Sequence, residues 1–220
     1  MRWNSFYKIQ NNNGGGVVDS EEQKAGESVS AIDRKKKIKG YILEGLFYAA
    51  LFFICAFVLP TYVVQRAKVS GPSMKNTLQD EENVLVSKIS YEIHSPERFD
   101  VVVFYPYKGR EEYKNDKEKL KEHYVKRVIG MPGETIQIKG SDIYVNGEIL
   151  EEHFGKDPIV YAGIAEEPVT LGKDEYFLMG DNRTESFDCR YAEIGPIHKN
   201  AIDGKVVLRI WPLKKFGTID

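Results

Sequence analysis

The chain of 220 residues predicts a mostly β domain, barrel-like or built on a coiled sheet, tethered by one N-terminal transmembrane helix. Two observations predict this class. Residues 41–64 form the most apolar run of the chain. Residues 65–220 carry short runs of β-branched and aromatic residues, bounded by Gly, Pro, Asn or Asp, and no long segment there has helical periodicity. Residues 66–220 are long enough to bury one hydrophobic core.

The apolar run at residues 41–64 reads YILEGLFYAALFFICAFVLPTYVV, and its one charged residue, Glu44, lies near its start. As a helix it would extend about 36 Å, enough to cross a hydrocarbon core of about 30 Å. A cleavable signal peptide has a shorter leading segment than the forty residues found here. We therefore predict an uncleaved signal anchor rather than a signal peptide or a buried core helix.

Basic residues flank the predicted span unequally. RKKKIK at 34–39 carries five basic residues before it, whereas only Arg66 and Lys68 follow closely. Because the more basic flank stays in the cytoplasm, we expect a single-pass protein of the cell membrane with residues 65–220 on the extracytoplasmic face. Residues 1–40 contain NNNGGG and few apolar positions, which predicts a disordered basic cytoplasmic tail. The net charge of −2 disfavours a nucleic-acid partner.

Seven segments of the outer part have strand character: 83–91, 99–107, 124–130, 134–140, 142–150, 174–180 and 204–211. The pair Asn146-Gly147 predicts a tight hairpin turn inside the fifth of them. Residues 108–123, KGREEYKNDKEKLKEH, interrupt the pattern with dense mixed charge, so we expect a solvated excursion between two strands.

A serine follows a Gly-Pro turn in VSGPSMKNTL at 69–78, where it can act as a nucleophile if a base lies nearby. No histidine has a recognisable catalytic setting, but a lysine can serve if burial lowers its pKa from about 10.4 toward 7 or 8. Lys126 in YVKRVIG would share a strand face with Tyr124 and Val128. Lys88 and Lys205 also lie in β-like runs, so periodicity alone does not select Lys126.

A third polar segment, GDNRTESFDCR at 180–190, gathers ionic and amide side chains in one loop. Asp188 and Arg190 can pair and fix its shape. From chemistry alone, metal binding and substrate binding remain equally open for this loop. The cysteines and histidines show no zinc-site spacing and no HExxH motif, and we expect no metal and no cofactor.

Taken together, the three segments resemble the bacterial type I signal peptidases. That family has a membrane anchor, then G-x-S-M-x-P-T-L, a G-D-V-V-V-F-like strand, K-R-V-x-G-x-P-G-D/E and G-D-N-x-x-x-S-x-D-S-R. This chain reads GPSMKNTL, FDVVVF, KRVIGMPGE and GDNRTESFDCR in the same order. The resemblance covers roughly residues 34–212. A lysine at position 126 is typical of the bacterial branch, since the eukaryotic and archaeal branch has histidine there.

The resemblance implies a Ser/Lys dyad. Ser73 would be the nucleophile, and Lys126 would be the general base that takes the serine proton and later activates water. The amide of Ser73 would donate to the oxyanion. Ser186 would orient Lys126 by a hydrogen bond. Three further residues would brace the same region: Asp181, Asp188 and Arg190.

The substrates implied are secreted preproteins that emerge from the translocation machinery at the lipid bilayer, cut after small residues at an A-x-A type site. Shallow apolar pockets would select those residues, and Met74 and Ile129 are plausible linings. Two alternatives remain: a membrane-tethered Ser/Lys protease with a different target, or a non-catalytic tethered binding domain.

Three positions depart from the family pattern. Asn76 stands where proline is usual, which we expect to loosen the turn slightly. Cys189 replaces the serine of D-S-R, and we expect it to be exposed beside the site and open to thiol reagents. Gly71 occupies a position where some members carry a serine that serves as a second oxyanion donor, so a backbone donor or water would complete the oxyanion hole.

Overall fold

The computed structural model describes residues 18–219, with the side chains of 34–57 and 63–219. The chain divides into two units, Met1–Cys55 and Ala56–Asp220. The first unit is helical over its described part, and the second contains all the described strands. The boundary between Cys55 and Ala56 falls inside the predicted span, so residues 56–64 of that span belong to the second unit.

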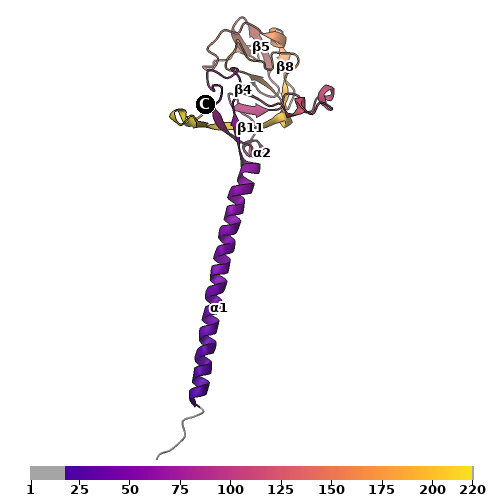
Figure 1. Cartoon of the computed structure of the whole chain (residues 1–220). Coiled ribbons are helices and arrows are strands. Elements are labelled where there is room, and N and C mark those ends of the chain that lie inside the picture. The colour runs from indigo at the N-terminus through magenta and orange to yellow at the C-terminus, as the bar shows by residue number, and fades with distance from the viewer. Residues whose placement is uncertain (1–17, 220) are drawn as a thin grey trace, which may run out of the picture. The chain divides into compact units, whose positions relative to one another are not determined.

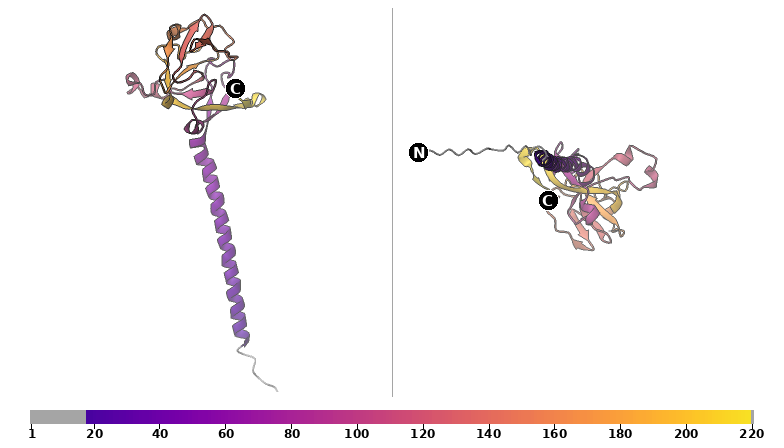
Figure 2. Two further views of the ribbon diagram at one scale, coloured as in Figure 1. Left: turned by 180° about the vertical axis from the view of Figure 1, so that it is seen from behind. Right: turned by 90° about the horizontal axis from the view of Figure 1, so that it is seen from below.

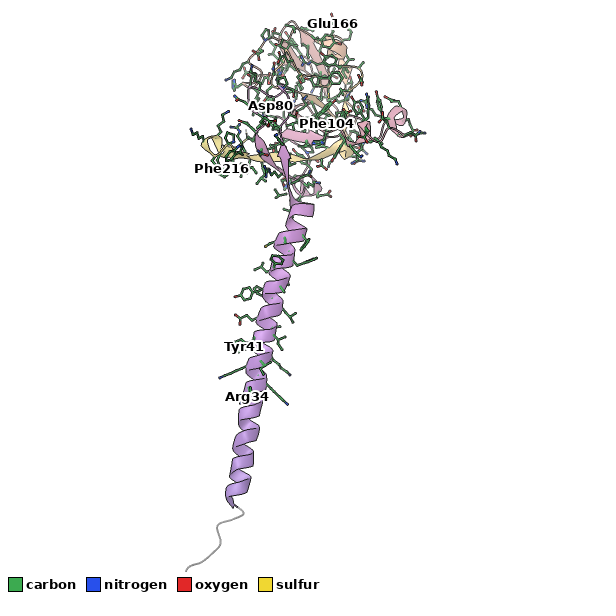
Figure 3. The ribbon with its side chains drawn as sticks, viewed as in Figure 1. Arg34, Tyr41, Asp80, Phe104, Glu166 and Phe216 are labelled. Atoms are coloured by element: carbon green, nitrogen blue, oxygen red, sulfur yellow. The ribbon has the colours of Figure 1, made fainter. Side chains whose placement is uncertain are left out.

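Helix α1, Val18–Phe53, runs directly into a π-helical segment η1, Ile54–Val63 (Figure 1). Pro60 lies in η1 and has no N–H to donate, so the α-helical hydrogen-bond pattern cannot continue unbroken through this segment. Within the described residues one helix, Arg34–Phe57, is long and apolar enough to cross a membrane. Its apolar side chains project outward and are exposed, as a helix facing lipid requires (Figure 3).

The structure differs from the predicted disordered tail, because α1 already begins at Val18. Residues 19–33 contain no proline and one glycine, and seven of the fifteen are Glu, Gln, Lys or Ala, which are good helix formers. Extending an existing helix needs no new nucleus, so the apolar helix can propagate into this polar segment. The remainder of the predicted tail, residues 1–17, lies outside the described residues.

The second unit contains two antiparallel sheets. The larger has the strand order β1-β2-β11-β3-β4-β9-β10, with β12 paired to β11. Its strands are β1 Val64–Lys68, β2 Asn83–Ser87, β3 Val101–Phe104, β4 Tyr124–Gly130, β9 Glu175–Met179, β10 Ile197–His198, β11 Ile202–Trp211 and β12 Gly217–Thr218. The smaller has the order β7-β6-β5-β8 and consists of β5 Thr135–Lys139, β6 Asp142–Val145, β7 Glu148–Ile149 and β8 Val169–Thr170.

Short helices connect the strands: α2 Ser90–Ile93, η2 Glu111–Tyr113, η3 Lys119–Lys121, η4 Gly163–Glu166, η5 Lys199–Ala201 and η6 Leu213–Lys215. Asn146 and Gly147 have φ of +55° and +86° and form the tight turn between β6 and β7, as predicted. All seven predicted runs contain strands, and the mostly β fold is confirmed.

The larger sheet curls on itself into a half-barrel. In the sheet order, β1 and β4 are separated by β2, β11 and β3, yet residues at the end of β1 and the start of β4 line one groove. A flat sheet would hold these strands far apart, so the curvature brings them together. Figure 2 shows the long strand β11 from two further directions as the gold arrow that spans this sheet.

Strand β3 is buried on both faces and separates two parts of the core. Val102 and Phe104 belong to the larger apolar cluster. Val101 and Val103 belong to a smaller one, which also includes apolar residues from 69–86. A continuous apolar run such as VVVF fits a strand covered on both sides. Val102 lies opposite Lys126 in the register with β4, so the predicted base sits beside this central strand.

Candidate active site

Ser73 opens a single helical turn that is anchored by two buried apolar residues. Lys75 N–H donates to the carbonyl of Pro72, and Leu78 N–H donates to that of Met74. The Met74 and Leu78 side chains are buried in the smaller core cluster and hold the turn against the sheet. Gly71, with φ of +88°, supplies the left-handed bend that leads into it. The serine side chain is left half-buried at a groove.

Lys126 reaches Ser73 from strand β4. Its Nζ lies 2.8 Å from Ser73 Oγ and 3.1 Å from the Val125 carbonyl oxygen. The side chain is only 4% exposed. This burial is the main cause that lowers the pKa of Lys126 to about 8, against a smaller raising contribution from Asp188. An amine with that pKa is substantially neutral in mildly alkaline solution and can accept a proton.

The two other lysines considered from the sequence lie in different surroundings. Lys88 pairs with Asp203 at 3.7 Å and is 31% exposed, and Lys205 pairs with Asp100 at 2.6 Å and is 34% exposed. Both are partly exposed to water and have a carboxylate partner, unlike Lys126. Burial therefore separates Lys126 from these two lysines, which periodicity could not do.

The loop at 180–190 packs directly against the turn that carries Ser73. Asn182 N–H donates to the Ser73 carbonyl at 3.0 Å, and Asn182 Nδ2 donates to the Pro72 carbonyl at 3.1 Å. A Cβ at Gly180 would lie 2.5 Å from the Ser73 carbonyl oxygen and 2.2 Å from Ser186 Oγ. Only glycine permits this close approach.

Asp181 is held by Arg127, the residue that follows Lys126 on β4. Arg127 Nε and Nη2 donate to the two Asp181 oxygens at 2.9 and 2.8 Å, and both side chains are fully buried. Thr77, in the Ser73 turn, also donates to Asp181 and accepts from Arg127 at 3.2 Å. The sequence reasoning placed Asp181 in the site and missed Arg127 and Thr77, although the KR pair of the KRVIG motif was a signal for the former.

Asp188 and Arg190 form the pair expected from the sequence. Arg190 donates to both carboxylate oxygens at 2.8 and 2.9 Å, and the Gly180 amide donates to Asp188 at 3.0 Å. Arg190 also donates to the carbonyls of Tyr161 and Arg183. Two bidentate buried pairs therefore brace the loop, and each satisfies backbone groups that would otherwise lack partners.

Ser186 lies close to the dyad without joining it. Its Oγ is buried and has no hydrogen-bond partner among the described residues. The predicted bond to Lys126 is therefore not formed in this structure, where the amine contacts Ser73 and the Val125 carbonyl instead. A buried hydroxyl without a partner carries a desolvation cost.

The expectation that Cys189 is exposed was wrong. Its side chain is fully buried in the larger core cluster, and its Sγ accepts a bond from Leu178 N–H at 3.1 Å. Burial raises the pKa of the thiol well above its usual range. Cys189 N–H also donates to the Leu178 carbonyl at 3.1 Å, which fixes residue 189 against β9. A neutral, covered thiol is shielded from thiol reagents.

Asn76 ties the Ser73 turn to its surroundings rather than loosening it. Its Nδ2 donates to the Asp181 carbonyl at 2.9 Å and to Asp157 Oδ2 at 3.3 Å. The side chain thus replaces the stiffness of a proline with a link to the 180–190 loop. Gly71 N–H donates to Asp80 at 3.0 Å, so its amide is already engaged.

A groove of about 590 Å³ runs past Ser73 and Lys126. One wall consists of residues 67–74, and the other of residues 121–126, with Val84 and Phe187 contributing apolar surface. Met74 lines it, as expected. Ile129 does not. It lies three residues beyond Lys126, where strand alternation turns it to the other face and into the larger core cluster.

The charged excursion at 108–123 also reaches this groove, through Glu118, Lys121, Glu122 and His123. It is largely exposed, as predicted, but it is anchored. Lys119 Nζ lies 3.0 Å from Glu193 Oε1 and 4.5 Å from the centre of the Tyr107 ring. The anchored excursion therefore forms part of the groove rim.

The family described as signal peptidase, peptidase S26, matches residues 42–211. A signal peptidase I of Leptolyngbya laminosa is 33% identical over 178 residues, 81% of this chain and 84% of the relative. A signal peptidase I of Bacillus caldolyticus is 37% identical over 173 residues, 73% of this chain and 84% of the relative.

Among solved structures, a signal peptidase I of Enterococcus faecalis V583 is similar at 26% identity and a TM-score of 0.38, covering 51% of this chain and 97% of its own. The family match spans most of the chain, and both relatives exceed 30% identity across most of their length. The chain therefore belongs to the signal peptidase family, peptidase S26, a family of serine proteases that remove signal peptides from preproteins.

Proposed function

We propose that Ser73 and Lys126 form the catalytic dyad of this signal peptidase and that it cuts preproteins after small residues of the A-x-A kind. The observation that carries the proposal is the 2.8 Å contact between Ser73 Oγ and a lysine amine whose pKa burial lowers to about 8. A buried amine in contact with a half-exposed hydroxyl has the geometry and the proton affinity of a general base.

The reaction then proceeds through an acyl-enzyme. Neutral Lys126 takes the Ser73 proton while Oγ attacks the carbonyl carbon of the residue before the cleavage site. The C–N bond breaks, and the leaving amine receives the proton from Lys126. A water molecule then gives a proton to neutral Lys126 and attacks the ester carbonyl. The bond to Ser73 Oγ breaks, and Oγ takes the proton back from Lys126.

The negative oxygen formed in each step needs donors. No hydrogen bond among the described residues uses the Ser73 amide as donor, so this N–H is available for the oxyanion. The bonds from Asn182 and the close packing of Gly180 hold the peptide of Ser73 in place. We propose that the braced loop serves the reaction in this way, by keeping the amide fixed in direction.

Two unpaired strand edges face the groove and suit an extended substrate. β1 pairs only with β2, at the end of the sheet order. Residues 124–126 of β4 pair with β3 on one side, whereas β9 pairs only with residues 127–130. A peptide that adds as a strand between these edges would place alternate side chains in the apolar lining. Shallow apolar walls favour small side chains at the first and third positions before the cut.

The membrane anchor supports a preprotein substrate. Ser73 follows residue 64 by nine positions, which at about 3.3 Å per residue holds it within about 30 Å of the end of the predicted span. We propose that the N-terminus is cytoplasmic, that the dyad lies on the extracytoplasmic face, and that substrates arrive there from the translocation machinery. Tethering enzyme and substrate to one bilayer raises their effective concentration.

The test is cleavage of a preprotein with an A-x-A site by the full chain in lipid vesicles. Wild type should cut just after the second alanine, with product masses fixing the bond. Ser73→Ala should abolish cutting, whereas Ser141→Ala, an exposed serine between β5 and β6, should cut like wild type. Cutting that persists in Ser73→Ala excludes the dyad. If folded wild type cuts nothing, the result favours a protease with a different target or a non-catalytic binding domain.

A further inference from the structure

A second cavity of about 260 Å³ lies beside the catalytic groove. Its lining residues are all polar: Lys75, Asn76, Asp157, Asn182, Thr184 and Glu185. The groove, by contrast, has apolar lining residues on both walls, among them Val69, Val84 and Val125. The two cavities thus differ sharply in chemistry.

Ser73 lines the groove close in the chain to residues that line the polar cavity. Glu185 lines both of them. Along the Ser73 turn, Ser73 and Met74 line the groove, and the next two residues, Lys75 and Asn76, line the polar cavity. A peptide that passes Ser73 therefore leaves an apolar environment on one side and enters a polar one on the other.

A preprotein has the same contrast around its cleavage site. The signal peptide before the bond is apolar or small in its side chains, whereas the mature protein after the bond is released into water. If each side of the substrate lies in the cavity of similar polarity, the signal peptide occupies the groove and the first residues of the mature protein occupy the polar cavity. The bond to be cut then lies at the boundary, beside Ser73.

The charge of the cavity indicates what it prefers. Asp157 accepts from Asn76 Nδ2 at 3.3 Å, and Glu185 accepts from Asn182 Nδ2 at 3.2 Å. These donors are neutral amides, and neither carboxylate has an ion-pair partner within 4 Å among the described residues. Both negative charges are therefore oriented but not neutralised, against the single positive charge of Lys75.

We propose that this cavity is the subsite for the first two residues of the mature protein, and that Asp157 and Glu185 make it favour basic over acidic side chains there. The inference rests on the proposed function and adds a substrate preference to it. The same two charges face the amino group that cleavage creates, and they stabilise its protonated form.

The test uses the full-length protein in detergent micelles with three peptides that share one A-x-A site and carry Lys, Gln or Glu at the second position after it. The measured quantity is the ratio of kcat/KM for the Lys peptide to that for the Glu peptide. For wild type we expect a ratio of about two to five, the range of an exposed charge pair. Raising the ionic strength from about 0.05 to 0.5 M should reduce it toward one.

The double variant Asp157→Asn with Glu185→Gln should bring the ratio close to one, because each amide oxygen can keep its hydrogen bond while the charge is lost. Glu167→Gln removes an exposed acidic residue outside both cavities and should keep the wild-type ratio. Equal rates for the Lys and Glu peptides in wild type, or a ratio unchanged in the double variant, would overturn the subsite proposal. Either result would leave the proposed function standing. Wild type that cuts none of the three peptides would remove the proposed function and the subsite with it.

Discussion

At the scale of single residues, burial decides the chemistry of this site. Lys126 is 4% exposed, and removal from water lowers its pKa to about 8. Cys189 is buried nearby, and the same physical cause raises the pKa of its thiol. The same burial thus favours the neutral amine of Lys126 and the neutral thiol of Cys189.

The pKa of Lys126 leads to a pH profile. The protonated amine cannot take the serine proton, so kcat/KM should rise about tenfold per pH unit below pH 8 and level off above it. The measurement is cleavage of a peptide without titratable side chains between pH 5 and 9.5. A histidine ordinarily titrates near pH 6.5, so the profile should survive His123→Gln, which removes the histidine of the groove. A flat profile contradicts a lysine base.

At the scale of elements, the site depends on how tightly one loop packs on one turn. The 180–190 loop approaches the Ser73 turn through Gly180 and is tied to it by Asn182 and Asp181. The buried pair of Arg127 and Asp181 links both to strand β4, which also carries Lys126. The proposed nucleophile Ser73 and the proposed base Lys126 are therefore positioned by a shared set of contacts.

A methyl group at position 180 tests this packing. In Gly180→Ala the new Cβ would meet the Ser73 carbonyl oxygen at 2.5 Å, so the turn must shift and the distance between Ser73 and Lys126 must change. We expect kcat to fall at least about tenfold, equivalent to about 1.4 kcal/mol. Gly217→Ala is the matched control, because its Cβ would meet nothing within 4 Å. Unchanged kcat in Gly180→Ala would contradict the argument.

At the scale of the whole molecule, the chain joins a helix fit to cross a membrane to a β domain with its own core. The helix exposes its apolar side chains over residues 34–57, whereas the β unit buries its apolar residues in two clusters. The contacts of the proposed dyad all lie within the second unit. We therefore expect the helix to affect where the enzyme meets its substrate rather than the chemistry itself.

Truncation separates these two roles. A chain that begins at Val64 should cut a short soluble peptide with the kcat/KM of the full chain, because groove and dyad are intact. On a preprotein inserted in vesicles it should be slower by about a hundredfold, since the shared tether is lost. Initial rates on both substrates measure the effect. Equal loss on both would mean that the helix also supports the β domain, and no loss on either would mean that tethering is irrelevant.

Much of the fold could be predicted because the signals were local. The pattern of YVKRVIG predicted β4 with its observed bounds, and the Asn-Gly pair predicted the turn between β6 and β7. Strand β1 was missed because its residues follow the apolar span without a turn between them. Strands β8, β10 and β12 were missed because two residues carry no periodicity.

By itself the sequence determined the apolar span, most of the strands, and the ordered segments that resemble a signal peptidase, because each depends on neighbouring residues in the chain. Only the tertiary structure decided that Lys126 rather than Lys88 or Lys205 is buried, that Cys189 points inward and that Ile129 lies away from the groove. The physical reason is that burial, and with it pKa, is set by segments far apart in the sequence, and these meet only when the sheet curls.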